Sequence, residues 1–330
     1  DINAFLGAID KKLKTNFIHG KSNINVIEAD ESDNSFNYLK PELSLITNID
    51  YDHMDFYGSK EKLYEAFQAF IKKTTKCVVL NFDCKNIQKN LKGLKSKKIT
   101  TFGYQNKKCD YYFTENTLGS LELYHGKRKV GEIFTNLEGL YNHYNLIGAI
   151  IVCIKLGISF KKISNSTNKI LTPKRRFENI FKSNNFEIYD DYAHHPSAIS
   201  SLRKMLNKKK DLCKNYLIFQ PHRYTRFKES YSDFIKEICQ WENVIVTDIY
   251  SAHESKKSKI SSKEFVKRVL KKKKINIHYI GEFDKIIDKM FLKYKKNKNK
   301  IKLITIGAGD VNQIGYRLKN LIKESKERAR

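Results

Sequence analysis

Short apolar runs that end in polar residues recur along the first half of the chain. Each has the length and composition of a buried strand, and they lie at 25–29, 43–49, 77–81 and 99–103. Residues 60–72 instead space their apolar side chains as an amphipathic helix does. A second, strongly apolar helix is predicted over 142–157, where a glycine ends it. Between them, 109–134 alternates like a meander of three strands, at 111–113, 121–124 and 130–134.

The second half of the chain alternates regularly between strands and helices. Helical segments of ten or more residues separate five predicted strands, at 186–190, 216–219, 244–247, 277–280 and 301–306. Such alternation implies a parallel sheet with helices on both faces. Thr172-Pro173 interrupts the pattern, and 330 residues suffice for two domains. The sequence therefore predicts an α/β chain with domains at 1–172 and 173–330.

Composition narrows the class of protein. With 40% hydrophobic and 12% aromatic residues, the chain can form a real core. No run approaches 18 consecutive apolar residues, which excludes a predicted membrane span. The net charge of +27 suggests nucleic acid at first, but only ten of the 63 basic residues are Arg and the Lys are scattered everywhere. We interpret this excess as compositional drift, with solvated lysine runs, and expect no nucleic-acid partner.

Cysteine usage and the first residue bear on the compartment. The six cysteines form no CxxC pair, and no signal-peptide pattern follows Asp1. We therefore expect reduced thiols in a cytoplasmic protein, and a chain that is either processed or a fragment.

Two groups of charged residues follow predicted strands of the first half. Four acids within six residues, Glu28 to Asp33, repel one another unless a cation or hydrogen-bond donors neutralise them. A hard cation such as Mg²⁺ suits such carboxylates together with phosphate oxygens, while capping of the next helix is the plainer alternative. His53, between Asp52 and Asp55, is a candidate metal ligand oriented by its neighbours.

A third group follows two strands of the second half. Asp190-Asp-Tyr-Ala-His-His-Pro and Phe219-Gln-Pro-His-Arg-Tyr-Thr-Arg each end a strand, and we expect the two strand ends to be neighbours. Arg223 and Arg226, beside His222, suit a clamp for a carboxylate or phosphate. If a helix starts there, their spacing puts both guanidinium groups on one face. The alternative to such a clamp is that the two segments are unrelated surface loops.

Taken in order, these motifs resemble those of the ATP-dependent Mur ligases. The resemblance covers about residues 16–315 and rests on Glu28-Ala-Asp-Glu-Ser-Asp, Thr47-Asn-Ile, Arg175-Arg-Phe, the two histidine motifs above and Gly307-Ala-Gly-Asp. It implies an incomplete central ATPase-type parallel-sheet domain, followed by a Rossmann-like C-terminal α/β domain. It also implies an amide-forming ligase of peptidoglycan precursor synthesis, with ATP and Mg²⁺ as cofactors. UDP-N-acetylmuramic acid and L-alanine would be the substrates, and the sequence does not indicate an oligomeric state.

The resemblance also implies roles for particular residues. Glu28 and His53 match the Mg²⁺ ligands, and His53 counts among the catalytic residues. Asn142 and Asn145 match the residues that contact adenine, whereas Arg176 and Asp191 match an arginine and an acid that reach ATP. Arg176 also counts among the catalytic residues. His222, Arg223 and Arg226 look like the amino-acid side of the site. The catalytic candidates include His194, His195 and His222, and the substrate-binding candidates are Tyr192, Arg223 and Arg226.

Departures from the family pattern leave three readings open. No Gly-rich phosphate loop with Lys-Thr-Thr precedes the acidic motif, and the UDP-binding domain is missing too. Tyr141 replaces the usual histidine before the adenine asparagine, and a serine replaces a common proline in the turn from Tyr250 to Glu254. The chain alone is therefore expected to be inactive. A ligase that recycles a peptide onto the same sugar acid, and a catalytically dead nucleotide-binding or scaffold remnant, are the alternatives.

Overall fold

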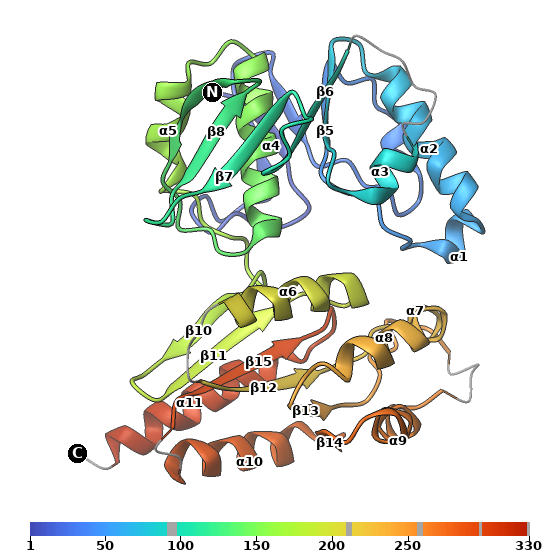
Figure 1. Ribbon diagram of the computed structural model, residues 1–330. Coiled ribbons are helices and arrows are strands. Elements are labelled where there is room, and N and C mark those ends of the chain that lie inside the picture. The colour runs from blue at the N-terminus through green and yellow to red at the C-terminus, as the bar shows by residue number, and fades with distance from the viewer. Residues whose placement is uncertain (91–97, 209–212, 256–259, 297–298, 329–330) are drawn as a thin grey trace. The chain divides into compact units, whose positions relative to one another are not determined.

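The computed structural model describes the whole chain except residues 91–97, 209–212, 256–259, 297–298 and 329–330 (Figure 1). It separates into two compact units. Unit 1 comprises Asp1–Gly7 and Thr15–Leu171, and unit 2 comprises Ala8–Lys14 and Thr172–Arg330.

Unit 1 is built on a six-stranded sheet of order β4-β5-β6-β7-β8-β9. Its first four strands run parallel and the last three form an antiparallel meander. The strands are β4 (Leu43–Ile46), β5 (Cys77–Asn81), β6 (Ile99–Tyr104), β7 (Tyr111–Glu115), β8 (Leu121–His125) and β9 (Arg128–Ile133). The helices are α1 (Met54–Tyr57), α2 (Lys60–Lys73), α3 (Lys85–Asn90), α4 (Leu140–Lys155) and α5 (Phe160–Thr167), with a 3₁₀ turn η1 at Ser35–Tyr38. The predicted strands, the meander and both predicted helices are confirmed, with ends shifted by a few residues.

Helices cover both faces of this sheet. On one face α4 packs its residues Leu146, Ile147, Ile150 and Ile151 onto strand residues that include Val79 and Phe102. On the other face α2 packs against residues such as Val78 and Leu80. Because β5 is buried on both faces, it reads as a continuous apolar run rather than an alternating one.

A small second sheet in unit 1 corrects one prediction. Its strands, in the order β2-β1-β3, are β1 (Asn3–Phe5), β2 (Phe17–Ile18) and β3 (Asn25–Ile27). The pattern at 25–29 predicted a buried strand, yet Val26 is 45% and Ile27 44% exposed. The prediction of burial is wrong because β3 pairs with β1 at the edge of this small sheet. An apolar run shows that a strand forms, and the tertiary packing decides what covers it.

Unit 2 is a doubly wound sheet of order β10-β11-β15-β12-β13-β14. Its five predicted strands are parallel, and β10 adds an antiparallel edge that the sequence pattern did not predict. The strands are β10 (Glu178–Lys182), β11 (Phe186–Asp191), β12 (Lys214–Phe219), β13 (Asn243–Val246), β14 (Asn276–Tyr279) and β15 (Ile301–Ile306). The helices are α6 (Pro196–Lys208), α7 (Tyr224–Glu229), α8 (Tyr231–Ile238), α9 (Ser262–Lys272), α10 (Phe283–Lys296) and α11 (Asn312–Glu327).

The helices of unit 2 lie on both faces of its sheet, as predicted (Figure 1). On one face, α10 and α11 pack onto apolar residues of β11, β12 and β15. On the opposite face, Phe219 of β12 contacts Phe227, Phe234 and Phe265, which come from α7, α8 and α9. The connection from β12 to β13 uses two short helices rather than the one long helix that the pattern predicted.

The order of strands in unit 2 corrects a second prediction. β11 and β12 are not neighbours, because β15 lies between them and pairs with both. The chain returns from β14 through α10 and inserts its last strand into the sheet. The carboxyl ends of β11, β15 and β12 therefore share one edge, and the loop after β15 joins the two histidine motifs there. Among the described residues, no helix is long and apolar enough to cross a membrane.

Candidate active site

Glu28 follows β3 directly and lies on the acidic segment of unit 1. Its Oε2 accepts a hydrogen bond of 2.8 Å from the amide of Gly7. The carboxylate lies close to Gly7, where a Cβ would come within 2.8 Å of Glu28 Oε1 and would displace the side chain. The residue as a whole is exposed. Glu28 is therefore held from one side and remains accessible to a ligand.

His53 lies beside the same acidic segment. Its Nε2 is 3.9 Å from Glu31 Oε1 and 3.9 Å from Asp52 Oδ2. The residue has φ 58°, a left-handed conformation that turns the chain into α1. Non-glycine residues in this region are strained and gather at functional sites. The predicted neighbour Asp52 thus does flank the ring.

The field around this segment is negative. The Tyr57 hydroxyl donates to the backbone carbonyl of Glu31. Burial, and then the nearby carboxylates of Glu31, Asp33 and Asp30, raise the pKa of Tyr57 to about 12. Within the described residues, no three His, Cys, Asp or Glu side chains form a metal site by themselves. A Mg²⁺ ion held by one or two protein ligands and completed by phosphate oxygens fits this arrangement.

Asn142 and Asn145 lie on the first turns of α4. Asn142 Nδ2 donates to the carbonyl of Glu138 at 2.7 Å, and Asn145 is exposed. Between them, the Tyr144 hydroxyl donates to Asp83 Oδ2 at 2.7 Å. Asp83 also accepts from the amide of Tyr104 at 2.6 Å, so it ties α4 to the ends of β5 and β6. The sequence analysis did not identify this anchor.

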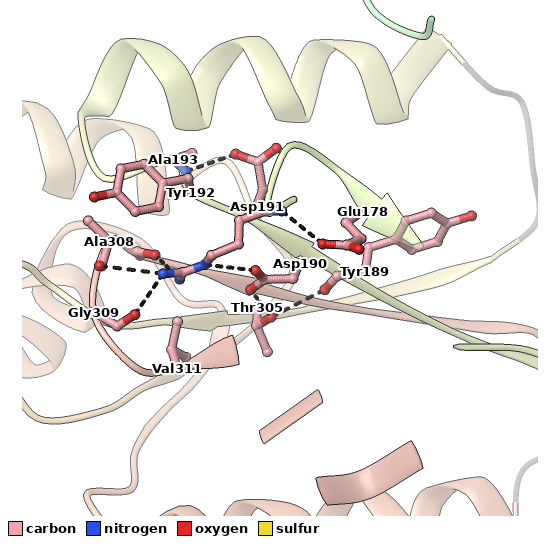
Figure 2. Close-up of polar contacts among 12 residues, drawn as sticks. Glu178, Tyr189, Asp190, Asp191, Tyr192, Ala193, Thr305, Ala308, Gly309 and Val311 are labelled. Carbon is pink, nitrogen blue, oxygen red and sulfur yellow. Dashed lines mark hydrogen bonds and ion pairs between the residues drawn. The ribbon is translucent and has the colours of Figure 1, made fainter. Parts of the chain in front are cut away.

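Arg175 joins two segments at the edge of unit 2. Figure 2 shows the residues of these segments, Asp190 of β11 and Gly309 of the loop after β15. Arg175 Nε donates to Asp190 Oδ2 at 3.0 Å, and its two terminal nitrogens donate to the carbonyls of Gly307 and Gly309 at 2.6 and 2.9 Å. Asp190 is fully buried and also accepts from Thr305 Oγ1 at 2.6 Å. Burial raises the pKa of Asp190, against the lowering effect of Thr305 and Arg175. The guanidinium thus joins the loop after β15 to the end of β11.

The loop after β15 is also held from β12. Gln220 is buried and donates from Nε2 to Asp310 Oδ1 at 2.7 Å, while its Oε1 accepts from the amide of Val311 at 3.1 Å. A Cβ at Gly309 would lie 2.4 Å from Gln220 Oε1 and 2.5 Å from the Tyr250 ring, so the loop needs glycine there. The motif Gly307-Ala-Gly-Asp is thus a packed connection.

Arg176 differs from its neighbour, because it is exposed. Its guanidinium carbon lies 5.8 Å from the centre of the Tyr192 ring. Asp191 is buried and accepts from the amides of Phe177 at 2.7 Å and Ala193 at 2.8 Å. Burial raises the pKa of Asp191 to about 6, although the two amides and Arg176 work against it. The structure thus places Arg176, Asp191 and Tyr192 together.

His222 and Arg226 form the next part of this edge. Arg226 Nη1 lies 3.1 Å from His222 Nδ1. The His222 ring stacks on Tyr250, with centres 5.6 Å apart and planes 9° from parallel, and lies 5.8 Å from His194. Burial, followed by electrostatic interaction with the nearby His194, Arg226 and Arg223, lowers the pKa of His222 to about 4. The ring is therefore neutral at physiological pH, with Nδ1 accepting from Arg226.

Arg223 lies just before α7 rather than on its face, since the helix begins at Tyr224. This corrects the expectation that both arginines would share one helical face. Arg223 Nε donates to Glu254 Oε1 at 2.7 Å, and Glu254 comes from the loop after β13. His194 Nδ1 contacts the carbonyl of Tyr192 at 2.8 Å, whereas His195 Nδ1 contacts Ser197 Oγ at 2.8 Å.

The structure thus gathers most of the predicted residues into two groups, one in each unit. In unit 1, Glu28 belongs to the acidic segment and His53 lies beside that segment at Glu31, while α4 carries the two asparagines. The group of unit 2 comprises Arg176, Asp191, Tyr192, His194, His222, Arg223 and Arg226. His195 contacts the start of α6 instead. Arg175, Asp190 and Glu254 lie within motifs of the sequence, but their contacts are visible only in the structure.

These features define the class of protein: an α/β enzyme with charged loops at the carboxyl ends of parallel strands, where such sheets bind ligands. Two family models match the chain. The Mur ligase middle domain matches residues 9–153, and the glutamate ligase domain of Mur ligases matches residues 175–305.

Comparison with known proteins gives the family. The UDP-N-acetylmuramate–L-alanine ligase of Fusobacterium nucleatum is 31% identical over 328 residues, which cover 95% of this chain and 68% of the relative. The chain belongs to the Mur ligase family, whose members are ATP-dependent ligases. It spans about two thirds of the length of this relative.

Solved structures confirm the fold. The UDP-N-acetylmuramate–alanine ligase of Thermotoga maritima matches with a TM-score of 0.76 at 22% identity, over 98% of this chain and 69% of that one. The MurF ligase of Thermotoga maritima, solved in complex with ADP, matches with a TM-score of 0.70 at 16% identity, over 93% of this chain and 69% of that one.

Proposed function

We propose that the chain carries the metal-binding and amino-acid-binding parts of a ligase that joins L-alanine to UDP-N-acetylmuramic acid. The observation that supports this most is the cluster of Arg226, His222 and His194 at the edge of unit 2, beside Arg223. A cationic, hydrogen-bonding group of this kind suits a small carboxylate such as that of an amino acid. The relative from Fusobacterium nucleatum is named for the addition of L-alanine.

Unit 1 would serve ATP and its metal ion. ATP would supply the phosphoryl group that activates the carboxylate of the sugar, with Mg²⁺ to neutralise phosphate charge. Glu28 and His53 would hold the ion, since they lie on or beside a segment whose acids raise the pKa of Tyr57. Asn142 and Asn145 on α4 would contact adenine. These roles rest on the family resemblance together with the accessible positions of Glu28 and Asn145.

Unit 2 would reach ATP through Arg176 and Asp191. Arg176 is exposed, so its guanidinium is available to a phosphate. Asp191 is fixed by the amides of Phe177 and Ala193, which orient its carboxyl group. Arg176 and Asp191 would position ATP. Arg175 would stabilise the neighbouring backbone through its bonds to Asp190 and to the loop after β15.

The histidines of unit 2 would handle protons on the amino-acid side. His222 accepts from Arg226 at Nδ1, so the neutral ring carries its proton on Nε2 and acts as a hydrogen-bond donor. His194 contacts a carbonyl oxygen through Nδ1, which must therefore donate. In the neutral ring Nε2 of His194 is then the basic nitrogen, and it would accept a proton from the ammonium of alanine. Tyr192 and His195 would shape the same side.

The chain alone is proposed to be a poor ligase. No Gly-x-x-x-x-Gly-Lys-Ser/Thr sequence occurs in the 330 residues. The backbone amides of such a loop normally supply much of the phosphate binding. Purified residues 1–330 should therefore bind ATP weakly and release no phosphate in response to alanine. We further propose a cytoplasmic location, since all six cysteines are described and unpaired.

Product formation by the protein expressed from its intact gene tests the proposal. With ATP, Mg²⁺ and UDP-N-acetylmuramic acid, we expect phosphate release that depends on L-alanine and not on a tripeptide. Dependence on the tripeptide would instead support the recycling ligase. If neither L-alanine nor the tripeptide causes phosphate release, the result would support a catalytically dead remnant.

A further inference from the structure

Two loops of unit 2 are joined along their backbones. The loop after β12 contains Pro221 and Arg223, and the loop after β13 contains Tyr250 and Glu254. The amide of Tyr250 donates to the carbonyl of Pro221 at 2.8 Å, and the amide of Arg223 donates to the carbonyl of Tyr250 at 2.8 Å. These bonds form a parallel bridge between His222 and Tyr250. The backbone of the proposed amino-acid site thus depends on the second loop.

Glu254 completes this connection with its side chain. Its Oε1 accepts from Arg223 Nε at 2.7 Å and from Thr225 Oγ1 at 2.6 Å, while its Oε2 accepts from the amide of Thr225 at 3.1 Å. The Glu254 side chain is only 15% exposed. Burial alone would raise its pKa, but the bonds from Thr225 and Arg223 outweigh burial and lower it. The group is therefore an ionised partner of Arg223 at physiological pH.

The backbone at this point is strained on both sides of the ion pair. Arg223 has φ 61°, and Ala252 and His253 have φ 48° and 68°. None of these residues is a glycine, and left-handed backbone persists at such positions only where the surroundings enforce it. Glu254 follows directly after this strained turn. The strained backbone of the loop thus brings the Glu254 carboxylate into contact with the Arg223 guanidinium.

We propose that Glu254 is a positioning residue for the amino-acid substrate, and that it acts by fixing the guanidinium of Arg223 before the substrate arrives. This inference rests on the proposed function and adds a residue to it. An arginine that is already immobilised loses less side-chain entropy when a carboxylate binds. Glu254 also balances part of the positive charge of Arg223 and Arg226, which lie three residues apart.

The test compares Glu254→Gln with a matched control in the ligase expressed from its intact gene. The glutamine keeps an acceptor for Thr225 and removes the charge that holds Arg223. We expect the KM for L-alanine to rise about tenfold, with kcat and the KM for ATP within about twofold of the wild type. Glu237 makes a similar pair with Arg203, at 2.6 Å and with a side chain 10% exposed, between α6 and α8. Glu237→Gln should lower stability to a similar degree without changing the KM for L-alanine.

Further variants separate the possible failures. If Arg223→Ala leaves the KM for L-alanine unchanged, the proposed amino-acid site itself is wrong. If Arg223→Ala raises it and Glu254→Gln does not, the site stands and Glu254 has no positioning role. If Glu237→Gln raises it as much as Glu254→Gln, the effect is one of general stability, and the inference is overturned. If Glu254→Gln fails to fold, Glu254→Asp replaces it, because aspartate keeps the charge but has a shorter side chain. The KM for L-alanine should then rise in Glu254→Asp, and an unchanged value would overturn the inference.

Discussion

The two candidate sites neutralise their charges in opposite ways. In unit 2, Arg175 is bonded to the buried Asp190 and to backbone carbonyls, and Arg223 is bonded to Glu254. In unit 1, by contrast, none of the described Lys or Arg side chains pairs with Glu28, Glu31 or Asp33. Unit 2 therefore holds its charges in place within the fold, whereas the acidic segment of unit 1 has no such partner among the described residues, as the proposed Mg²⁺ site would require.

The contrast is informative because the chain as a whole is strongly basic. With 63 basic against 36 acidic residues, lysine is available almost everywhere along the sequence. A cluster of acids without a lysine or arginine partner among the described residues agrees with the proposed metal site, because a cation would then relieve the repulsion between the carboxylates. Four of the ten arginines, namely Arg175, Arg176, Arg223 and Arg226, lie at the edge of unit 2, where planar, bidentate contacts are useful.

The largest expected effect is on the free energy of unfolding, and it concerns the ion pair between Arg175 and Asp190 in unit 2. Arg175→Ala leaves Asp190 buried without its charged partner, so the free energy of unfolding should fall by about 3–5 kcal/mol. Arg176→Ala, at an exposed neighbour, should change it by less than about 0.5 kcal/mol. Urea unfolding followed by the fluorescence of Trp241, the single tryptophan and a buried residue of unit 2, measures both. Equal losses in the two variants would contradict the contrast between these neighbours.

The second prediction concerns pH. Burial raises the pKa of Asp191 in the folded state to about 6, above its ordinary value of 3.8. Below about pH 4 the Asp191 carboxyl group is protonated and makes its full contribution to the free energy of unfolding. This contribution is lost as the pH rises through about 6, because the buried group must then become charged. Relative to Asp191→Asn, the wild type should lose about 3 kcal/mol of unfolding free energy over this range. His222, which titrates in the opposite sense, is present in both proteins. A constant difference between the two curves would show that Asp191 titrates normally.

The third prediction concerns the acidic segment of unit 1. Glu28→Gln or His53→Ala in the ligase expressed from its intact gene should lower kcat/KM for ATP by about a hundredfold, since each removes a proposed metal ligand. Circular dichroism should show an unchanged fold. Glu42→Gln is the control, because Glu42 is an exposed acid that pairs with Lys76 next to the amino end of β4. Near-wild-type turnover of both variants at ordinary Mg²⁺ concentrations would remove Glu28 and His53 from the metal site.

The smallest effect concerns the arginines of the amino-acid side. Arg226→Lys and Arg223→Lys keep the charge but lose the planar fork, so the KM for L-alanine should rise about tenfold, with that for ATP changing much less. Steady-state kinetics with each substrate varied in turn provides the measurement. Weaker ATP use with unchanged alanine use would assign these arginines to the phosphate side instead.

Much of the fold could be predicted because its signals are local. The strands of both large sheets are apolar runs such as Cys77–Asn81 and Ile301–Ile306, which are buried along their whole length. The position of β15 between β11 and β12 could not be predicted, since it depends on how the last segment returns to the sheet. The exposure of Val26 likewise depends on which strands surround it, and its own sequence carries no such information.

The sequence predicted which motifs belong to the candidate site, but it did not predict which residues of these motifs contact one another. Arg175 and Arg176 are identical in type and adjacent, yet one is internal and one is exposed, because the chain reverses between left-handed residues at Arg175 and Phe177. The partner of Arg223 lies 31 residues further along the chain, at Glu254, and only the pairing of two loops brings it close. Local sequence indicates which residue types a site contains, and tertiary structure decides which of them meet.

The most direct test of the account is one experiment that addresses both sites. Chain 1–330, labelled with ¹⁵N and supplied with excess ATP, is titrated in parallel with Mn²⁺, as a paramagnetic substitute for Mg²⁺, and with L-alanine, and its NMR signals are followed. The account predicts that Mn²⁺ broadens the signals of residues 28–33 and His53, and that L-alanine shifts the side-chain signals of Arg223 and Arg226. Broadening elsewhere with no effect on the acidic segment, or alanine shifts that bypass both arginines, would contradict the assignment of metal to unit 1 and amino acid to unit 2.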